Sequence, residues 1–450
     1  MAQTRQDMGS GNVKKLLLQL MIPAIVAQVV NLLYNIVDRI YIGHIAGIGA
    51  AALTGVGLFA PILMLLNAFA MLIGAGGAPR TAIALGQGNK DEAEKIIGNS
   101  FTMLLFFAVV LTIGFYAGAP LLLRLFGASE ATLPYALAYS RIYILGSVCV
   151  LLVMGMNPFI TTQGFAKISM LTTVIGAVIN IILDPIFIFG FGMGTGGAGV
   201  ATALSQSIGF CILLSMFLRG RTVSQFRITK VTRSARDFGQ IFFNGAPSFG
   251  RQGLNSIGGM LLNIAAREYG DAAVAGMSII SRIFMFILSV AIGVGQGLQP
   301  VAAFNYGAKK YRRVRQAAIF TIFAAFCFVC VLNVVCWCNS ETLIHLFRDD
   351  PEVLAVALPA FRYQCLAMFL QPVIVVANMM FQSIGKSGRA TFLACCRQGV
   401  CFIPLILTLP HLLGLPGIEM CQPIADMLTF FISVPFLLPF LHKLNRMEEA

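Results

Sequence analysis

Three carboxylates are the clearest acids inside the long apolar runs of a sequence that has few acidic side chains. They are Asp38, Asp184 and Asp426, out of 18 Asp and Glu residues in the whole chain. An ionisable group in the middle of a bilayer costs roughly 2.5–3.5 kcal/mol on insertion scales, so it is retained where it has a partner or a function. If the apolar runs cross a membrane, these three carboxylates are the first candidates for chemistry.

The segment 180–185 places several oxygen ligands close together. Asn180 and Asp184 are four residues apart and are therefore neighbours on one face of a helix. Pro185 cannot donate a hydrogen bond to the carbonyl group of Ile181, which leaves that oxygen free. A carboxylate, an amide and a free carbonyl are hard oxygen donors, which suit a sodium ion or a water-linked proton. The segment therefore predicts a cation or proton site.

A second acid and a hydroxyl group are expected at a similar depth. Asp184 follows the basic Lys167 by 17 residues, which is about 26 Å along a helix, and Asp38 follows Lys15 by 23 residues, or about 34 Å. Both rises reach the outer half of a membrane if the lysines are cytoplasmic. Thr202 lies a few residues into its own apolar run, counted from the outer side. Three apolar runs thus offer polar groups at similar depth.

Structural roles for these residues remain open alternatives. Asp38 is also consistent with an interfacial acid that pairs with the adjacent Arg39. The Asn180 amide can form a hydrogen bond between helices, as polar groups in membranes often do. Asp426 has no matching acid in the first half of the chain, so the sequence favours neither role for it.

The elements that must position these residues are membrane spans. The chain of 450 residues is 58% hydrophobic and only 11% charged, whereas soluble domains carry about 25% charged residues. This excludes a soluble enzyme and predicts an all-α membrane protein. Twelve apolar runs can cross about 30 Å of hydrocarbon, and the first has no small-residue cleavage site and is expected to remain as a signal anchor. The runs are 16–42, 50–78, 96–118, 135–161, 168–190, 198–218, 238–265, 272–298, 317–338, 353–383, 391–413 and 418–441.

Basic residues fix the expected orientation. The net charge of +13 does not indicate nucleic-acid binding, because the basic residues form short clusters between apolar runs. With the N-terminus inside, about 22 of the 31 Lys and Arg residues fall in inner segments, which is a strong positive-inside signal. Both termini are therefore predicted to be cytoplasmic.

No motif for enzymatic chemistry is complete. Gly385-Lys386-Ser387 has the form of the end of a nucleotide-binding loop, but Met380 stands where its first glycine belongs. The four histidines are scattered, so the sequence indicates no metal centre. The sequence predicts a protein that is not an enzyme and that draws its energy from an ion gradient.

The two halves of the chain resemble each other at a constant offset. An offset of 221 residues pairs Pro79 with Pro300 and Asn157 with Asn378, and an offset of 224 pairs Pro23 with Pro247, Gln28 with Gln252 and Asn31 with Asn255. Because six spans are an even number, the repeats are parallel. The expected organisation is an N-lobe (1–220), a basic cytoplasmic linker (221–237) and a C-lobe (238–450).

Several short segments resemble the multidrug and toxic compound extrusion (MATE) transporters. They are residues 35–43 (NIVDRIYIG), 180–190 (NIILDPIFIFG), 196–202 (GGAGVAT), Gln299-Pro300 with Asn305-Tyr306-Gly307, and Arg397-Gln398. Their order and spacing match the family along essentially the whole chain, and residues 180–185 look most like the bacterial DinF-like and MepA-like branch. The resemblance implies twelve helices in two pseudo-symmetric six-helix lobes that form a V-shaped cleft.

The resemblance also implies roles for individual residues. Position by position, the cation-coupling or proton-coupling residues, which would also be the ligands of a sodium ion, are Asp38, Asn180, Asp184 and Thr202. Residues of the substrate cavity are Asn31, Tyr34, Tyr139 and Asn157, and the residues with a conformational role are Pro23 and Pro185. The seventh and tenth spans carry Gln252, Asn255 and Gln364 where some branches have acids, so C-lobe sodium coupling of that kind is not expected.

The implied function is antiport by alternating access. H⁺ or Na⁺ enters as the coupling ion, without another cofactor, while a drug-like and often cationic or amphipathic organic compound leaves. The expected setting is the inner membrane of a bacterium, where the chain acts as a monomer in the lipid bilayer without a nucleic-acid partner. A lipid-linked oligosaccharide flippase of the wider superfamily is the alternative, although its cavity would be basic, whereas Asp38 and Asp184 favour a cationic substrate.

Overall fold

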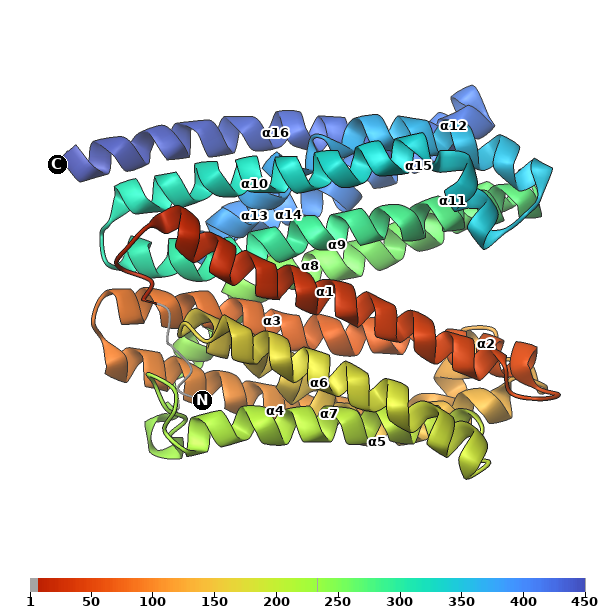
Figure 1. Cartoon of the computed structure of the whole chain (residues 1–450), viewed down its shortest axis with the longest axis horizontal. Helices are drawn as coiled ribbons and strands as arrows, with labels where there is room; N and C mark the ends of the chain where they lie inside the picture. Colours follow the sequence, from red (N-terminus) through yellow and green to blue (C-terminus); the bar gives the residue numbers. More distant parts are fainter. Residues whose placement is uncertain (1–6, 233, 450) are drawn as a thin grey trace. The chain divides into compact units, whose positions relative to one another are not determined.

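The computed structural model describes residues 7–232 and 234–449, and every regular element in these ranges is a helix (Figure 1). Arg5 and Arg233, two of the basic residues assigned to inner segments, and both chain ends lie outside these ranges. The first half comprises α1 (Val13–Gly43), α2 (Gly49–Gly57), α3 (Ala60–Gly86), α4 (Lys90–Leu125), α5 (Leu133–Thr162), α6 (Ala166–Pro185), the π-helical turn η1 (Ile186–Gly190), α7 (Thr195–Leu218) and the 3₁₀ turn η2 (Ile228–Lys230).

The second half repeats this pattern of long helices. It comprises α8 (Ala235–Arg267), α9 (Asp271–Gly307), α10 (Tyr311–Cys338), α11 (Ser340–Phe347), α12 (Pro351–Met368), α13 (Gln371–Ser383), α14 (Ser387–Cys395), the π-helical segment η3 (Cys396–Phe402), α15 (Ile403–Leu413) and α16 (Leu415–Glu449). Four segments predicted as single spans comprise more than one element. Segment 50–78 contains α2 and α3, 168–190 contains α6 and η1, 353–383 contains α12 and α13, which are bent by 52° at a short break, and 391–413 contains α14, η3 and α15.

Within the described residues, ten helical spans are long and apolar enough to cross a membrane, and the bent pair α12–α13 adds an eleventh. The one remaining predicted span, 238–265, corresponds to α8. This helix has 33 residues, which is about 50 Å and ample for a crossing. It is less apolar than the others because it carries Arg251, Gln252 and Asn255.

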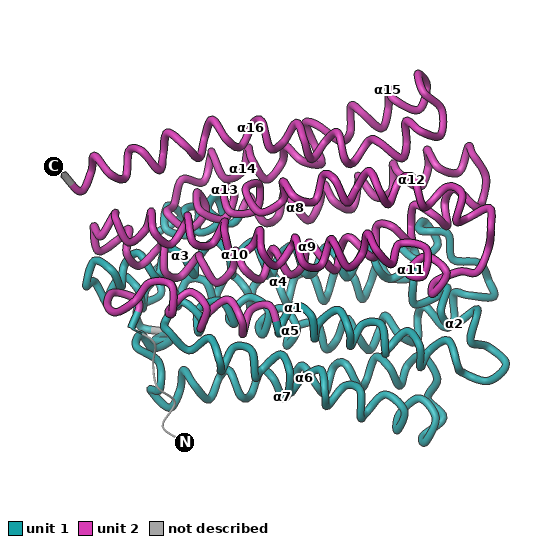
Figure 2. Tube along the Cα trace, turned by 45° about the horizontal axis from the view of Figure 1, so that its top comes forward, with its two compact units in different colours: residues 1–7, 26–245 teal, residues 8–25, 246–450 magenta. Residues whose placement is uncertain are grey.

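The chain divides into two compact units, shown in different colours in Figure 2. Unit 1 contains residues 1–7 and 26–245, and unit 2 contains residues 8–25 and 246–450. These boundaries differ from those predicted for the lobes, because α1 and α8 each contribute residues to both units. Residues 13–25 of α1 belong to unit 2, and residues 235–245 of α8 belong to unit 1.

Close helix packing explains this division, and it follows the sequence repeat. In unit 1, a Cβ atom at Gly76 of α3 would collide with the carbonyl oxygen of Ile241 in α8. In unit 2, a Cβ atom at Gly297 of α9 would lie 2.8 Å from Cα of Met21 in α1. Gly76 and Gly297 are 221 residues apart, so they are equivalent positions of the repeat. In each unit this glycine lets the backbone of a neighbouring helix approach closely.

Equivalent hydrogen bonds confirm the internal repeat. Asn157 Nδ2 donates to the carbonyl oxygen of Ser169 at 3.2 Å, and Asn378 Nδ2 donates to that of Ala390 at 2.7 Å. Both donors and both acceptors are separated by 221 residues. Asn157 and Asn378 therefore form equivalent hydrogen bonds between consecutive helices, one in each unit.

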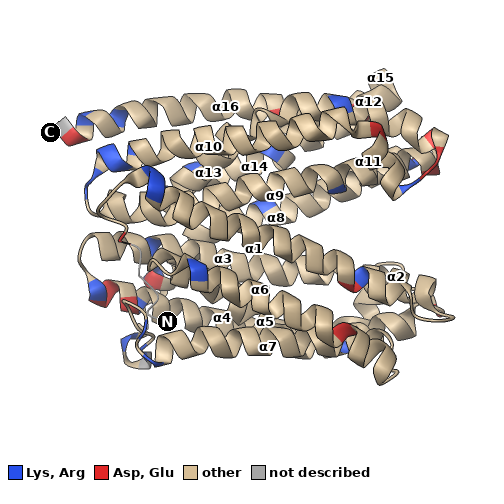
Figure 3. Ribbon diagram, viewed as in Figure 1, with Lys and Arg blue, Asp and Glu red and all other residues tan. Residues whose placement is uncertain are grey.

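The basic linker is attached to the start of α4. Glu94 is almost completely buried and accepts a hydrogen bond from Lys230 Nζ at 2.8 Å and from the Gln225 backbone N–H at 3.3 Å. Hydrogen bonds to Asp91 and Glu94 raise the pKa of Lys230. Asn99 binds Thr232 through its side-chain oxygen and nitrogen, at 3.0 and 3.1 Å. Many charged residues gather at the ends of the helices, and basic residues also lie within several helix bodies of the second half (Figure 3).

Candidate functional site

One face of α1 carries three of the predicted site residues. Asn31, Tyr34 and Asp38 are spaced three and four residues apart, so they line up along the helix. Asp38 is only 8% exposed, although it lies near the end of α1. The adjacent Arg39 is exposed and, within the described part of the chain, forms no ion pair with it. The geometry therefore does not show the interfacial Asp38–Arg39 pair that the sequence also allowed.

The end of α6 positions Asp184. Pro185, which lacks an N–H group, ends the α-helix, and the chain continues as the π-helical turn η1, in which the Phe191 N–H reaches the carbonyl oxygen of Ile186. This wider turn packs on α7 at Gly197, where a Cβ atom would lie 2.7 Å from the carbonyl carbon of Phe187. Glycine at this position lets α7 approach the site closely.

Asn180 lies beside Asp184 on α6, and the close approach of α7 also brings it to Thr202. With its nitrogen oriented toward Asp184, the Asn180 amide donates to Oδ2 of Asp184 at 3.3 Å. Its oxygen then accepts from the backbone N–H and the hydroxyl of Thr202, each at 3.2 Å. The exposed fractions are 0% for Asp184, 1% for Asn180 and 5% for Thr202. These three residues form one buried hydrogen-bonded group.

Asp38 joins this group from α1. The carboxyl groups of Asp38 and Asp184 lie within hydrogen-bonding reach of each other. The Oδ1 atom of each accepts no hydrogen bond from the described residues. Two carboxylates this close repel each other by roughly 4–5 kcal/mol at an effective dielectric constant near 20. This repulsion is relieved when one carboxyl group is protonated or when another cation lies between the two.

Aromatic side chains cover the acids. Tyr34 and Tyr139 lie close enough to Asp38 to interact with it electrostatically. Tyr139 stacks on Tyr143, with ring centroids 5.7 Å apart, and both rings contact Phe59. The sequence analysis did not single out Phe59 and Tyr143. The four-residue spacing of the tyrosines on α5 is the signal that could have indicated a shared face.

Asn157 lies elsewhere in unit 1. It binds Ser169 and Thr173, near the opposite end of α6 from Asp184. Thr173 precedes Asp184 by 11 residues, which is about 16 Å along a helix.

Pro23 lies within the continuous helix α1, two residues before the boundary of unit 2 at Ile25. Among the described residues, no group of three or more His, Cys, Asp or Glu side chains could hold a metal ion.

Asp426 in unit 2 has a different environment. It is fully buried on α16 and accepts hydrogen bonds from Arg397 Nε at 2.7 Å, Gln364 Nε2 at 2.8 Å and Gln422 Nε2 at 3.0 Å. Arg397 is in the π-helical segment η3, and its side chain is 17% exposed. The carboxylate is thus neutralised by a neighbouring cation, in contrast to the paired acids of unit 1.

Comparison with known proteins agrees with this arrangement. The MatE family model matches residues 23–186 and again residues 247–408, once in each half of the repeat. The chain is 25% identical to a multidrug export protein MepA of Staphylococcus haemolyticus over 420 residues, which cover 93% of this chain and 92% of the relative. It is 27% identical to the MepA of Staphylococcus saprophyticus over 410 residues, which cover 90% and 89%.

Solved structures show the same likeness. An outward-facing multidrug resistance MATE family transporter of the MOP superfamily superimposes with a TM-score of 0.91 at 25% identity, over the full length of both chains. A MATE structure in complex with MaL6 gives 0.89 at 26% identity over 98% of each chain. The buried acids, the repeated helices and these matches lead to one conclusion: the chain belongs to the MatE family.

Proposed function

We propose that the chain is a cation-coupled antiporter that exports drug-like, often cationic organic compounds across the inner membrane of a bacterium by alternating access. The single observation that carries the proposal is the pair of buried acids, Asp38 and Asp184, within hydrogen-bonding reach of each other. The names of the relatives in Staphylococcus, which are multidrug export proteins, support the substrate class.

The pair gives a physical basis for coupling. With one carboxyl group protonated, or with Na⁺ between the two, their repulsion is relieved and the group is stable when buried. Without the cation, two adjacent carboxylates favour a conformation that separates or hydrates them. A ligand shifts a conformational equilibrium only through such a difference in affinity between two states. Entry of H⁺ or Na⁺ and exit of the drug are thereby linked.

The other members of the group would hold the acids in place. Asn180 orients Asp184 through its amide nitrogen and is itself fixed by Thr202. The amide and hydroxyl oxygens, with the free Oδ1 atoms of both acids, are ligands suitable for Na⁺ as well as for a proton carried on water. The acidic character of the group favours a cationic substrate over the diphosphate of a flippase substrate.

The distribution of basic residues sets the orientation that we propose for the chain in the membrane. We place both termini on the cytoplasmic side and assign the protein as a monomer that needs no nucleic acid and no cofactor besides the coupling ion. The basic segment that starts at Lys309 is then cytoplasmic. A membrane-impermeant amine reagent applied to intact cells should leave Lys309 unmodified, and labelling of Lys309 from outside would reverse the orientation.

The coupling role is tested by conservative neutralisation. Asp184→Asn and Asp38→Asn keep the side-chain shape but remove the charge that must be compensated. We expect each to abolish energy-dependent efflux of ethidium from cells at unchanged expression. Asp349→Asn is the matched control, because Asp349 is 89% exposed, and it should transport like the unmodified protein. Full efflux by Asp184→Asn would overturn the proposal.

A further inference from the structure

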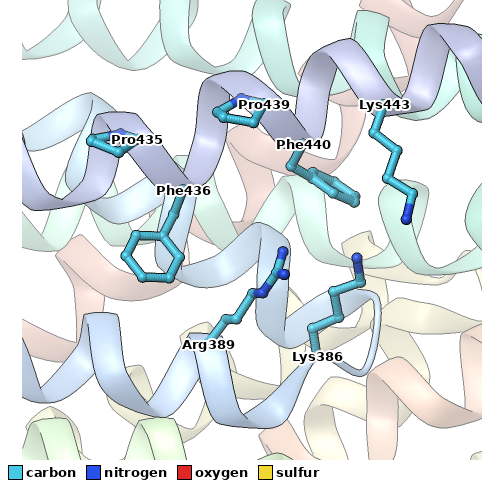
Figure 4. Close-up of a pocket in the computed structure, with 7 residues that line it drawn as sticks. All are labelled: Lys386, Arg389, Pro435, Phe436, Pro439, Phe440 and Lys443. Atoms are coloured by element: carbon cyan, nitrogen blue, oxygen red, sulfur yellow. The ribbon is translucent and has the colours of Figure 1, made fainter.

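A cavity in unit 2 opens between the end of α16 and the loop before α14 (Figure 4). It has a volume of ≈ 380 Å³, which is within the range of small-molecule sites. Three cationic side chains extend into it, Lys386 and Arg389 from the α14 side and Lys443 from α16. No acidic side chain is among the described residues that line the cavity.

The cavity is positively charged. Within the described residues, none of the three cations forms an ion pair. Lys386 Nζ instead lies 4.6 Å from the ring centroid of Phe440, and the Arg389 guanidinium lies 5.9 Å from that of Phe381. Burial and the like charges of Arg389 and Lys443 lower the pKa of Lys386. An anion in the cavity would relieve this repulsion.

The cations lie where the apolar runs end. Lys443 follows the predicted apolar run of α16 by two residues, and Arg389 precedes that of α14 by two. This is the level of the lipid head groups if the runs cross the hydrocarbon core. All three lie at helix ends that the charge pattern assigns to the cytoplasmic side, where anionic lipids create a negative surface potential.

An apolar wall continues from the cations toward the membrane core. Phe436 and Phe440 line the cavity, and Phe436 packs on Phe392 with centroids 5.6 Å apart. Toward the membrane core, Phe392 of α14 and Leu428 of α16 are 44% and 43% exposed, and Leu428 shares a face of α16 with the lining residue Pro439, from which it is 11 residues, or about three turns, away. A ligand that carries a phosphate at one end and a hydrocarbon chain at the other matches both parts of this surface. A free phosphate ion would leave the apolar part unused.

We propose that this cavity binds the phosphate group of an anionic phospholipid, such as phosphatidylglycerol, whose acyl chain follows the exposed apolar surface of α16. Arg389 offers paired N–H donors to two phosphate oxygens, and the two lysines supply point charges. The site lies in unit 2 and shares no residue with the acidic group of unit 1. It therefore does not depend on the proposed transport function.

Native mass spectrometry of the purified full-length chain tests the proposal. The protein in detergent is titrated with dioleoylphosphatidylglycerol, dioleoylphosphatidylcholine or inorganic phosphate. A basic residue near an anionic lipid surface contributes about a fivefold change in affinity. Lys443→Gln should thus weaken phosphatidylglycerol binding about fivefold, and the triple variant Lys386→Gln/Arg389→Gln/Lys443→Gln should weaken it about 100-fold. Phosphatidylcholine should bind more weakly than phosphatidylglycerol to the unmodified protein.

Matched controls make the result decisive. Lys15→Gln removes an exposed cation of the same unit and should leave phosphatidylglycerol binding unchanged. Arg389→Lys keeps the charge but loses the paired N–H donors, so it should weaken binding less than Arg389→Gln does. Lys443 is exposed, so its substitution does not disturb the packing. Undiminished phosphatidylglycerol binding by the triple variant would overturn the proposal. Inorganic phosphate that binds as tightly as the lipid would overturn the assignment to a phospholipid.

Discussion

The buried ion pair between Arg397 and Asp426 gives a quantitative prediction. Arg397→Met removes the cation, which leaves a fully buried carboxylate with only Gln364 and Gln422 as donors. Removing one partner of a buried ion pair costs about 3–5 kcal/mol, because the remaining charge stays out of water. We expect this loss in the free energy of unfolding. Asp426→Asn should cost less, because Arg397 is 17% exposed and can reach water.

The double variant Arg397→Met/Asp426→Asn carries neither charge. It should recover at least half of the summed losses, since no uncompensated charge remains. Equilibrium unfolding of the purified protein by sodium dodecyl sulfate in mixed micelles gives the four free energies of the cycle. Additive losses, with a coupling energy below about 0.5 kcal/mol, would refute the structural role of the pair. Ethidium efflux by the double variant should persist, which separates this pair from the acids of unit 1.

Other predictions concern the packing around the site and the linker. Gly197→Ala forces a Cβ atom against the η1 backbone and should lower both stability and efflux, whereas Gly190→Ala, with open space at its Cβ position, should have little effect in the same thermal-unfolding and efflux assays. Asn157→Ala and Asn378→Ala remove equivalent hydrogen bonds, so each should cost about 0.6–1.7 kcal/mol in unfolding experiments, and a loss in only one would contradict the equivalence. The raised pKa of Lys230 means that its attachment is fully present below the unfolded value of about 10.4 and is lost as the pH rises through the folded value. Proteinase K should therefore cleave the linker of Lys230→Gln faster than that of the unmodified protein near neutral pH, and equal rates at pH 8 would contradict this.

Local patterns in the sequence predicted the core of the site. The four-residue spacing of Asn180 and Asp184 fixes their neighbourhood on a helix, and Pro185 necessarily disturbs the turn that follows. Counting residues from the nearest lysines placed Asp38 at a comparable depth, and the structure brings it to Asp184. The neighbourhood of Asn180 and Asp184 is confirmed because it depends only on the geometry of one helix, whereas the contact of Asp38 with Asp184 joins α1 to α6.

Contacts between distant helices could not be predicted in this way. Arg397 and Asp426 are 29 residues apart on different helices, and nothing in either segment fixes which faces meet. The sequence likewise does not reveal that the helix register directs the Asn157 amide to Ser169 and Thr173. The divided membership of α1 and α8 depends on close packing at Gly76 and the residues equivalent to it, which composition does not reveal.

We propose that the paired acids Asp38 and Asp184 couple cation entry to drug export, and transport in proteoliposomes measures this coupling. Purified protein is reconstituted, and ethidium transport is followed under an imposed H⁺ gradient and, separately, an imposed Na⁺ gradient. Transport should be driven by at least one of the two gradients in the unmodified protein and in Asp349→Asn, and it should be absent in Asp184→Asn under both. Gradient-driven transport by Asp184→Asn at the unmodified rate would contradict the account.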